Sequence, residues 1–360
     1  MKNYFKTFVS NTLASTQNQV CFFSDGTRQR GRVFLKAFAS GLYEYSFLFS
    51  DTINSTYAGG DISKVNETCG NWTIHSAKVL LLQSDCGGIL NAKVEPVKEI
   101  QLTFNKKVEK LVLAGENFST DLVTIKIDKA DTFCVEIEFS GTKMPYFEEA
   151  IVPIYRYENG EWVLNKKVPL PEMVGVARKV EKRIGFLGDS ITEGIGVDCG
   201  SYEHWNAKIA EMTGDKYSYW NIGIGFARAA DAASNGAWLA KAKQMDVVTV
   251  CLGVNDMGRG YSATEIKCNI ETIVRILQDN KVRTILFTVP PFDYNEENKA
   301  KWLEINNYIL KDLSKITEVY DVVPIWGDKT PNEQHAIYGG HPNAEGCIAL
   351  ATDFINKIQL

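Results

Sequence analysis

The feature that most constrains the fold is a change in hydrophobic pattern near the middle of the 360-residue chain. Before about residue 165, short β-rich runs are separated by Gly, Asn and Asp turn residues, whereas after residue 183 short apolar runs alternate with helical stretches. The chain exceeds the roughly 100–200 residues of a typical domain, so either half can bury a core of its own. We therefore expect two domains of different architecture.

The first half predicts many short strands, a spacing that is typical of a β-sandwich or a jelly roll. The expected strands are 32–37, 44–49, 78–82, 99–104, 110–113, 123–127, 134–139 and 151–157. Two prolines and many charged residues in 166–182 predict a connector there. We therefore expect a jelly-roll-like β-sandwich over residues 1–168.

The second half predicts an α/β domain over residues 180–360. The expected strands are 183–187, 217–221, 247–252, 283–289 and 319–323, and the expected helices are 202–212, 228–243, 263–279, 295–315 and 344–357. This alternation is typical of a parallel sheet with helices on both faces. Ligands of such domains bind beyond the carboxyl ends of the strands, so functional residues are expected in the loops that follow them.

Composition excludes several classes of protein. Hydrophobic residues make up 45% of the chain and charged residues 23%, as in ordinary globular proteins. The net charge is −5 and the basic residues are scattered, so we expect no nucleic-acid partner. Apolar runs such as 247–252 are far shorter than the ~20 residues of a membrane-spanning helix, so we expect no membrane partner. The pattern gives no information on the oligomeric state.

Eight cysteines show no CxxC spacing. We interpret them as buried small side chains rather than as metal ligands or a disulfide framework. Unpaired cysteines fit a reducing cytoplasm. The first fifteen residues are interrupted by Asn, Lys and Ser, which disfavours a signal peptide. We therefore expect a cytoplasmic protein without a bound metal.

Ser190 directly follows the first expected strand of the second half, in the segment GDSITEG at 188–194. Flanking glycines allow a tight turn, and backbone N–H groups near a helix start can hold a developing oxyanion. These properties suit a nucleophile. The alternative is a helix cap, because Glu193 stands three residues after Ser190 as in a capping box.

Two further loops end at the same edge of the expected sheet. Asn255 and Asp256 follow the third strand, where an amide donor can reach an oxyanion beside Ser190. Gly223 and Gly225 follow the second strand and offer backbone N–H groups. The alternatives are an ordinary turn for the Asn-Asp pair and a tight strand–helix connection for the glycines.

His341 lies in a Gly-rich loop before the last expected helix, where it can act as a general base for Ser190. His75, His204 and His335 lack such neighbours, and we interpret them as structural or chance histidines.

Together these segments resemble the SGNH hydrolase superfamily over about residues 183–357. GDSITEG is similar to its first block with Ser190 as the serine, GVND to its third block with Asn255, and His341-Pro342 to its last block. The resemblance implies a three-layer, flavodoxin-like domain and a serine esterase without a cofactor. It implies an oxyanion hole from Ser190, Gly223 or Gly225, and Asn255. Asp189 and Asp256 would support the site.

One position departs from the superfamily pattern, because Tyr338 stands where an aspartate usually precedes the histidine by three residues. The chain then resembles the two-domain enzymes of carbohydrate esterase family 2, in which a backbone carbonyl replaces the aspartate. Asp328 and Glu333 are the alternative carboxylates.

The same resemblance implies an O-acetyl ester of a sugar or oligosaccharide as substrate. Alternatives are a lysophospholipase, a thioesterase or general short-chain esterase, and a catalytically silent carbohydrate-binding protein. Aromatic residues of the first half are candidates for stacking on sugar rings, although alternating aromatics in a strand more often belong to a core. They are Tyr43, Tyr45, Phe47, Phe49 and Trp72.

Overall fold

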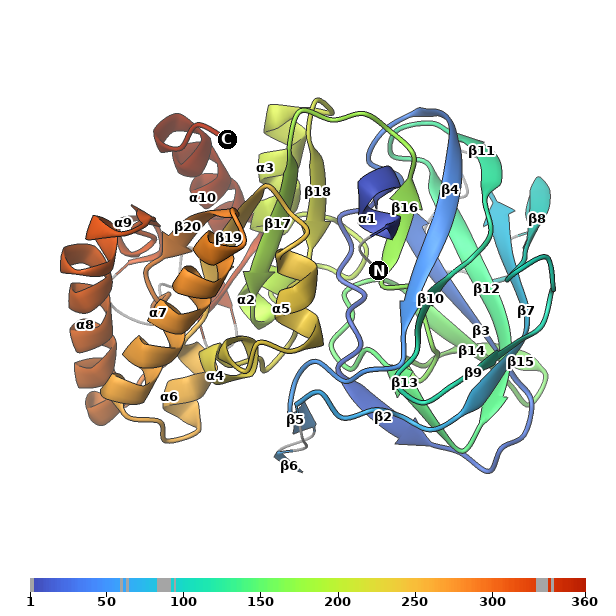
Figure 1. Cartoon of the computed structure of the whole chain (residues 1–360), viewed down its shortest axis with the longest axis horizontal. Helices are drawn as coiled ribbons and strands as arrows, with labels where there is room; N and C mark the ends of the chain where they lie inside the picture. Colours follow the sequence, from blue (N-terminus) through green and yellow to red (C-terminus); the bar gives the residue numbers. More distant parts are fainter. Residues whose placement is uncertain are drawn as a thin grey trace. The chain divides into compact units, whose positions relative to one another are not determined.

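The chain forms two compact units, Met1–Lys179 and Val180–Leu360, coloured from blue to red along the sequence in Figure 1. The computed structural model describes residues 3–58, 61–62, 65–82, 92–93, 95–327, 336–337 and 340–360. Within these ranges, none of the helices combines the length and the apolar composition that a membrane span requires.

The first unit begins with a short helix, α1 (Tyr4–Thr7), and the other elements in its described residues are antiparallel strands. One five-stranded sheet has the order β1 (Val9–Ser10), β16 (Met173–Val176), β4 (Gly41–Ser50), β10 (Asn117–Ser119), with β11 (Val123–Ile127) also on β4. A seven-stranded sheet has the order β15 (Glu161–Leu164), β14 (Ile154–Glu158), β3 (Gln29–Lys36), β12 (Thr132–Gly141), β7 (Trp72–Leu81), β8 (Lys98–Leu102), with β9 (Lys110–Val112) also on β7. Two short pairs join β2 (Val20–Phe23) to β13 (Lys143–Tyr146) and β5 (Tyr57–Ala58) to β6 (Asp61–Ile62).

Aromatic side chains join the two large sheets of this unit. The Phe118 ring of β10 stacks on Phe49 of β4 at 5.2 Å between centroids and lies 6.4 Å from Trp72 of β7. Tyr45, Phe47, Phe49 and Trp72 are at most 1% exposed. These four rings therefore belong to the core, as the alternation of aromatics along a strand favoured, and they are not sugar-stacking residues.

The expected connector over 166–182 is also wrong in part. Met173–Val176 forms β16, a fully buried strand that pairs with both β4 and β1. An apolar four-residue run can complete a sheet despite the prolines before it, because these prolines lie outside the paired segment. The first unit accordingly extends to Lys179 rather than to residue 168.

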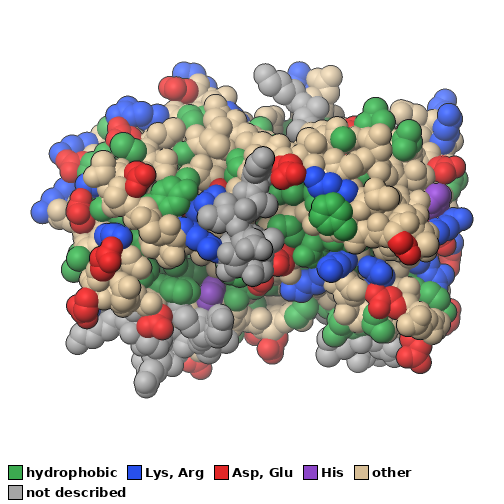
Figure 2. Space-filling view, turned by 90° about the horizontal axis from the view of Figure 1, so that it is seen from below, with side chains coloured by type: hydrophobic (Ala, Val, Ile, Leu, Met, Phe, Trp, Pro, Cys, Tyr) green, Lys and Arg blue, Asp and Glu red, His purple; other side chains and the backbone are tan. Residues whose placement is uncertain are grey.

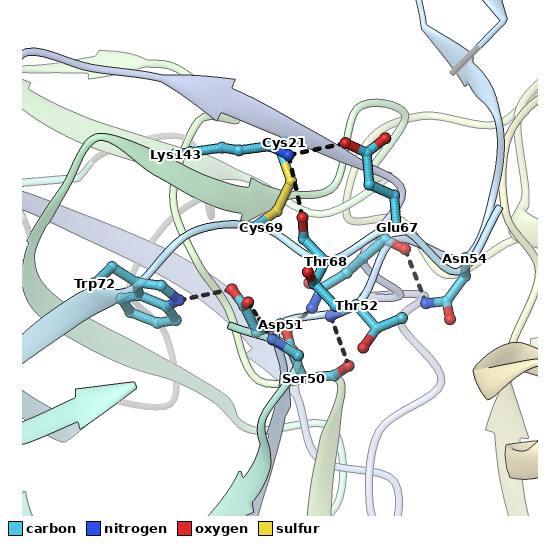
Figure 3. The surroundings of a disulfide bond; sticks show 12 residues. Cys21, Ser50, Asp51, Thr52, Asn54, Glu67, Thr68, Cys69, Trp72 and Lys143 are labelled. Carbon is cyan, nitrogen blue, oxygen red and sulfur yellow. Dashed lines mark hydrogen bonds and ion pairs between the residues drawn. A yellow bond between two sulfur atoms is a disulfide. The ribbon is translucent and has the colours of Figure 1, made fainter. Parts of the chain in front are cut away.

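The cysteine interpretation is wrong for Cys21 and Cys69, which form a disulfide between β2 and the segment before β7. Figure 3 shows the Lys143 ammonium beside it, bound to the Glu67 carboxylate at 2.9 Å and the Thr68 carbonyl at 3.1 Å. Pairing depends on the tertiary proximity of residues 48 positions apart, which spacing motifs do not reveal. The argument for a cytoplasmic location from unpaired cysteines therefore no longer holds.

The other five described cysteines lie outside this disulfide, and they differ in exposure. Cys134, Cys251 and Cys347 are buried as expected, whereas Cys199 and Cys268 are exposed. Cys86 lies outside the described residues.

The second unit contains a parallel five-stranded sheet. Its order is β18 (Ser218–Asn221), β17 (Arg183–Gly188), β19 (Val247–Cys251), β20 (Arg283–Phe287), β21 (Glu318–Tyr320). In chain order this is 2-1-3-4-5, the order of flavodoxin-like sheets. The second unit is thus a mixed α/β domain with a flavodoxin-like strand order.

Helices cover this sheet, and they alternate with its strands along the chain (Figure 1). They are α2 (Ser190–Glu193), α3 (Trp205–Thr213), α4 (Ala229–Ala233), α5 (Ala237–Ala242), α6 (Val254–Gly258), α7 (Ala263–Asp279), α8 (Glu296–Lys311), the 3₁₀ turn Leu313–Lys315, α9 (Val323–Trp326) and α10 (Ala344–Lys357). A short antiparallel pair joins β22 (Ala336–Ile337) to β23 (His341–Pro342).

Helix α7 has both the cap and the apolar face by which a helix is predicted from sequence. Ser262 and Glu265 form a capping box at its start. Ile266, Ile270 and Ile273 then recur on one face and are at most 1% exposed. The expected helix 228–243 instead divides into α4 and α5, because the chain turns through a left-handed Asn235 between them.

Acidic and basic side chains are interspersed on the face drawn in Figure 2. The scattered charges of the sequence thus do not gather into one basic patch on this face.

Candidate active site

Ser190 and His341 come together in the second unit. Ser190 is the first residue of α2, one residue after the end of β17, and His341 begins β23. The Ser190 Oγ and the His341 Nε2 lie 2.8 Å apart, although 151 residues separate them in sequence. This is the distance of a hydrogen bond between a nucleophile and a general base.

The His341 ring is held by its surroundings. It is 7% exposed and packs edge-to-face on Phe292 with 5.2 Å between ring centroids. Gly340 before it has φ +92°, and a Cβ there would lie 2.9 Å from the Phe292 backbone. A glycine is therefore required at this close approach. Tyr338, Gly339, Asp328, Glu333 and His335 lie outside the described residues.

The cap of α2 is Asp189 and not Ser190. The Ile191 N–H donates to Asp189 Oδ1 at 3.0 Å. The capping-box alternative for Ser190 is thus not what the structure shows. Within the described part of the chain, the backbone N–H of Ser190 has no hydrogen-bond acceptor, so it can serve an anion beside its own side chain.

Three buried side chains hold α2 through its carbonyl groups. Trp205 Nε1 donates to Ile191 O at 3.2 Å, Asn206 Nδ2 to Thr192 O at 2.6 Å, and Asn221 Nδ2 to Glu193 O at 3.0 Å. All three donor residues are fully buried. A helix of one turn is not stable by itself in water. These contacts therefore fix the element that carries Ser190.

Asn255 and Asp256 lie in the first turn of α6 rather than in an open turn. Asn255 Nδ2 donates to Ala227 O at 3.0 Å, which uses one of its two amide hydrogens. The Asp256 carboxylate accepts the N–H groups of Ala229 at 2.8 Å and Ala230 at 3.3 Å. These two residues thereby hold the segment between β18 and α4 against the end of β19.

Gly223 lies in the loop after β18, against the nucleophile helix. Its N–H donates to Asn221 Oδ1 at 3.0 Å. A Cβ at this position would lie 2.4 Å from the Glu193 backbone nitrogen, so only glycine fits. Gly225 follows in the turn before Phe226, which has φ +62°. The structure therefore brings both glycines into the loop next to α2.

Residues 186–347 match the GDSL-like lipase/acylhydrolase family. This match covers Ser190, the loops after β18 and β19, and His341. The second unit carries a GDSL-like lipase/acylhydrolase domain. As a GDSL-type acylhydrolase, it belongs among enzymes that cleave carboxylic esters.

Solved structures similar to the chain include three esterases. The psychrotrophic esterase EstA from Pseudoalteromonas has 18% identity and a TM-score of 0.40, with 49% of this chain and 94% of that one covered. The acetyl xylan esterase AlAXEase has 20% identity and a TM-score of 0.40, with 49% and 100% covered. A family two carbohydrate esterase from Cellvibrio japonicus has 12% identity and a TM-score of 0.39, with 97% and 95% covered. No curated protein matches the chain.

Two buried carboxyl groups of the GDSL-like domain lie next to this machinery. Burial raises the pKa of Asp189 to about 7, and the nearby charge of Asp256 adds to this effect. Burial raises the pKa of Asp256 to about 6, although its two backbone N–H donors act in the opposite direction. The carboxyl group adjacent to the nucleophile therefore titrates near neutral pH.

Sequence reasoning missed the residues that hold α2 in the GDSL-like domain. Asn221 closes the buried run of β18 and Asn206 lies in the first turn of α3, so each is a polar residue within an apolar segment. A polar residue inside an apolar segment is the sequence signal by which both could have been found. His204 is structural, as interpreted: it is fully buried, and its Nδ1 lies 2.6 Å from Asn206 Oδ1. Burial lowers the pKa of His204 to about 4, so the ring is neutral.

Proposed function

We propose that the protein is a serine esterase that removes O-acetyl groups from sugars or oligosaccharides through an acyl-Ser190 intermediate. The observation that carries the proposal is the 2.8 Å contact between Ser190 Oγ and His341 Nε2 at the carboxyl end of a parallel sheet. Family membership supplies the reaction class, and the sequence resemblance to carbohydrate esterase family 2 supplies the substrate class.

In the proposed reaction, Ser190 Oγ attacks the ester carbonyl while His341 Nε2 takes the hydroxyl proton. The tetrahedral intermediate collapses when the imidazolium returns this proton to the leaving sugar hydroxyl. Water then attacks the acyl-serine while the imidazole takes its proton, and the second tetrahedral intermediate breaks its bond to Ser190 Oγ as the imidazolium protonates that oxygen, which releases the acetyl group as acetic acid and restores Ser190. His341 must be neutral to accept the first proton, so activity falls as the ring protonates.

The oxyanion hole of this proposal consists of the Ser190 N–H, an N–H from the loop with Gly223 and Gly225, and the Asn255 side chain. The Ser190 N–H is open to an anion, and Asn255 is fixed by Ala227 with one amide hydrogen remaining. Gly223 already donates to Asn221 Oδ1 in this structure, and both glycines stay candidates.

For the orientation of His341 we propose a backbone carbonyl, because Tyr338 occupies the usual aspartate position. Asp328→Asn and Glu333→Gln should then retain most activity. If either carboxylate is the third member, its amide variant should lose about 10⁴-fold in kcat, as in a serine protease with a true aspartate.

The first unit is proposed to be a jelly-roll-like β-sandwich that accompanies the esterase domain. The two antiparallel sheets and the aromatic core between them support this proposal. Lysophospholipase, thioesterase and catalytically silent binding functions remain the alternative outcomes of the experiment.

A substrate panel tests the proposal with 4-nitrophenyl acetate, acetylated xylo-oligosaccharide, a lysophospholipid and an acyl thioester. We expect the acetylated sugar to give the highest kcat/KM. Ser190→Ala and His341→Ala should each lower activity by several orders of magnitude. Ser314→Ala, in the 3₁₀ turn before β21 of the same unit, serves as the control and should change nothing. Activity that survives in Ser190→Ala refutes the mechanism, and faster turnover of a lipid or thioester refutes the substrate class.

A further inference from the structure

We infer that Asn221 is a positioning residue that links the nucleophile helix to the oxyanion loop. Its amide nitrogen holds Glu193 O of α2 at 3.0 Å, and its amide oxygen holds the N–H of Gly223 at 3.0 Å. The inference rests on the proposed function, since it gives this side chain a role in the reaction of Ser190.

Because Asn221 is buried, the loss of either of these two hydrogen bonds is costly in free energy. The side chain is fully buried, at the last position of β18. No water competes for a buried amide, so loss of either bond leaves a polar group unsatisfied. The amide is also geometrically fixed, because one end must donate and the other must accept.

The two partners of Asn221 belong to the two segments that supply the backbone donors of the proposed oxyanion hole. Glu193 is the last residue of the helix that starts with Ser190, and Gly223 opens the loop that leads to Gly225. Backbone bonds from Ile222 N to Phe186 O and from Ile224 N to Gly188 O continue the register of this loop along β17. Asn221 is the side chain that joins the same loop to the end of α2.

Asn206 offers a matched comparison. It is also fully buried, and its amide nitrogen also holds a carbonyl of α2, that of Thr192. Its amide oxygen, however, faces His204 Nδ1 and not the oxyanion loop. Substituting either asparagine by alanine therefore removes one anchor of α2 and one further buried bond, but only Asn221→Ala uncouples the loop.

The experiment compares Asn221→Ala and Asn206→Ala in the full-length protein. We expect similar losses of thermal stability. Asn221→Ala should lower kcat for 4-nitrophenyl acetate by about 100-fold with KM changed by less than about 3-fold, the size that a 1 Å misplacement produces. Asn206→Ala should lower kcat by no more than about 10-fold. An equal loss of kcat in both variants, or a loss confined to KM, overturns the inference.

A second measurement separates failure of this inference from failure of the proposed function. Hydrogen exchange of the segment 218–226 reports on the Gly223 N–H without any substrate. We expect faster exchange there in Asn221→Ala than in Asn206→Ala, and unchanged exchange overturns the inference. Absence of esterase activity in the wild-type protein refutes the proposed function, and the exchange result then decides on the link itself.

Discussion

Replacing Asp189 by Asn should remove a pH-dependent loss of stability from the GDSL-like domain. Asp189 is 1% exposed, and its Oδ2 has no hydrogen-bond partner within the described part of the chain. Its pKa is raised from 3.8 to about 7, chiefly by burial. The folded state therefore holds this proton more tightly than the unfolded state, so stability is greatest at low pH and declines as pH rises from about 4 through 7.

The size of the effect follows from the two pKa values. A difference of 3.2 units between 3.8 and about 7 corresponds to about 4 kcal/mol at pH 8, of which about 2.5 kcal/mol arises between pH 5 and pH 8. This is a large share of the 5–15 kcal/mol that stabilises a typical domain. In Asp189→Asn the side-chain oxygen can still accept the Ile191 N–H, and the group stays neutral at every pH.

Urea unfolding followed by tryptophan fluorescence measures this difference. Five of the seven tryptophans (205, 220, 238, 302 and 326) belong to the second unit, and all five are buried. The free energy of unfolding of the variant should rise relative to wild type by about 2.5 kcal/mol from pH 5 to pH 8. Asp279→Asn on the exposed end of α7 is the control and should leave the pH profile unchanged. Parallel profiles for Asp189→Asn and wild type would refute the reasoning.

Three further predictions concern other parts of the molecule. Asn255→Ala should lower kcat by about 10²–10³-fold with little change in KM, because its amide meets charge that develops in the transition state; a pure KM effect would place it in ground-state binding. Replacing both Cys21 and Cys69 by Ala should lower the unfolding free energy of the first unit by up to about 4 kcal/mol in calorimetry, given the 48-residue separation, and an unchanged transition would contradict this. Chelators should leave esterase activity intact, since the proposed reaction uses no metal; EDTA-sensitive activity restored by a divalent ion would count against it.

The sequence predicted elements well where local signals agree. Helices α7 and α10 have the expected bounds, 263–279 and 344–357, because a cap and an apolar face coincide in each. All five strands of the parallel sheet were expected within a few residues, because their apolar runs are short and bounded by polar loops. The adjacency of Ser190 and His341 followed from the shared edge of the sheet and from the motif resemblance.

Other features depend on contacts distant in sequence. β16 is defined by its pairing with β4, and the disulfide by the meeting of Cys21 with Cys69, so neither has a local signature. The roles of Asn206 and Asn221 depend on which carbonyl each amide faces. Hydrophobic periodicity describes what is buried, whereas the partners of a buried polar group are set by the assembled fold.

The separation of 151 residues between Ser190 and His341 also bears on how the domain acquires activity during folding. The nucleophile follows β17, the first strand of the parallel sheet in chain order. Its base, His341, lies beyond β18, β19, β20 and β21 in the sequence. A partly folded intermediate that contains the early strands holds a serine without its partner. Because closing such a long loop is slow, recovery of catalysis after dilution from denaturant should follow the slowest folding phase, and esterase turnover becomes a reporter of complete refolding.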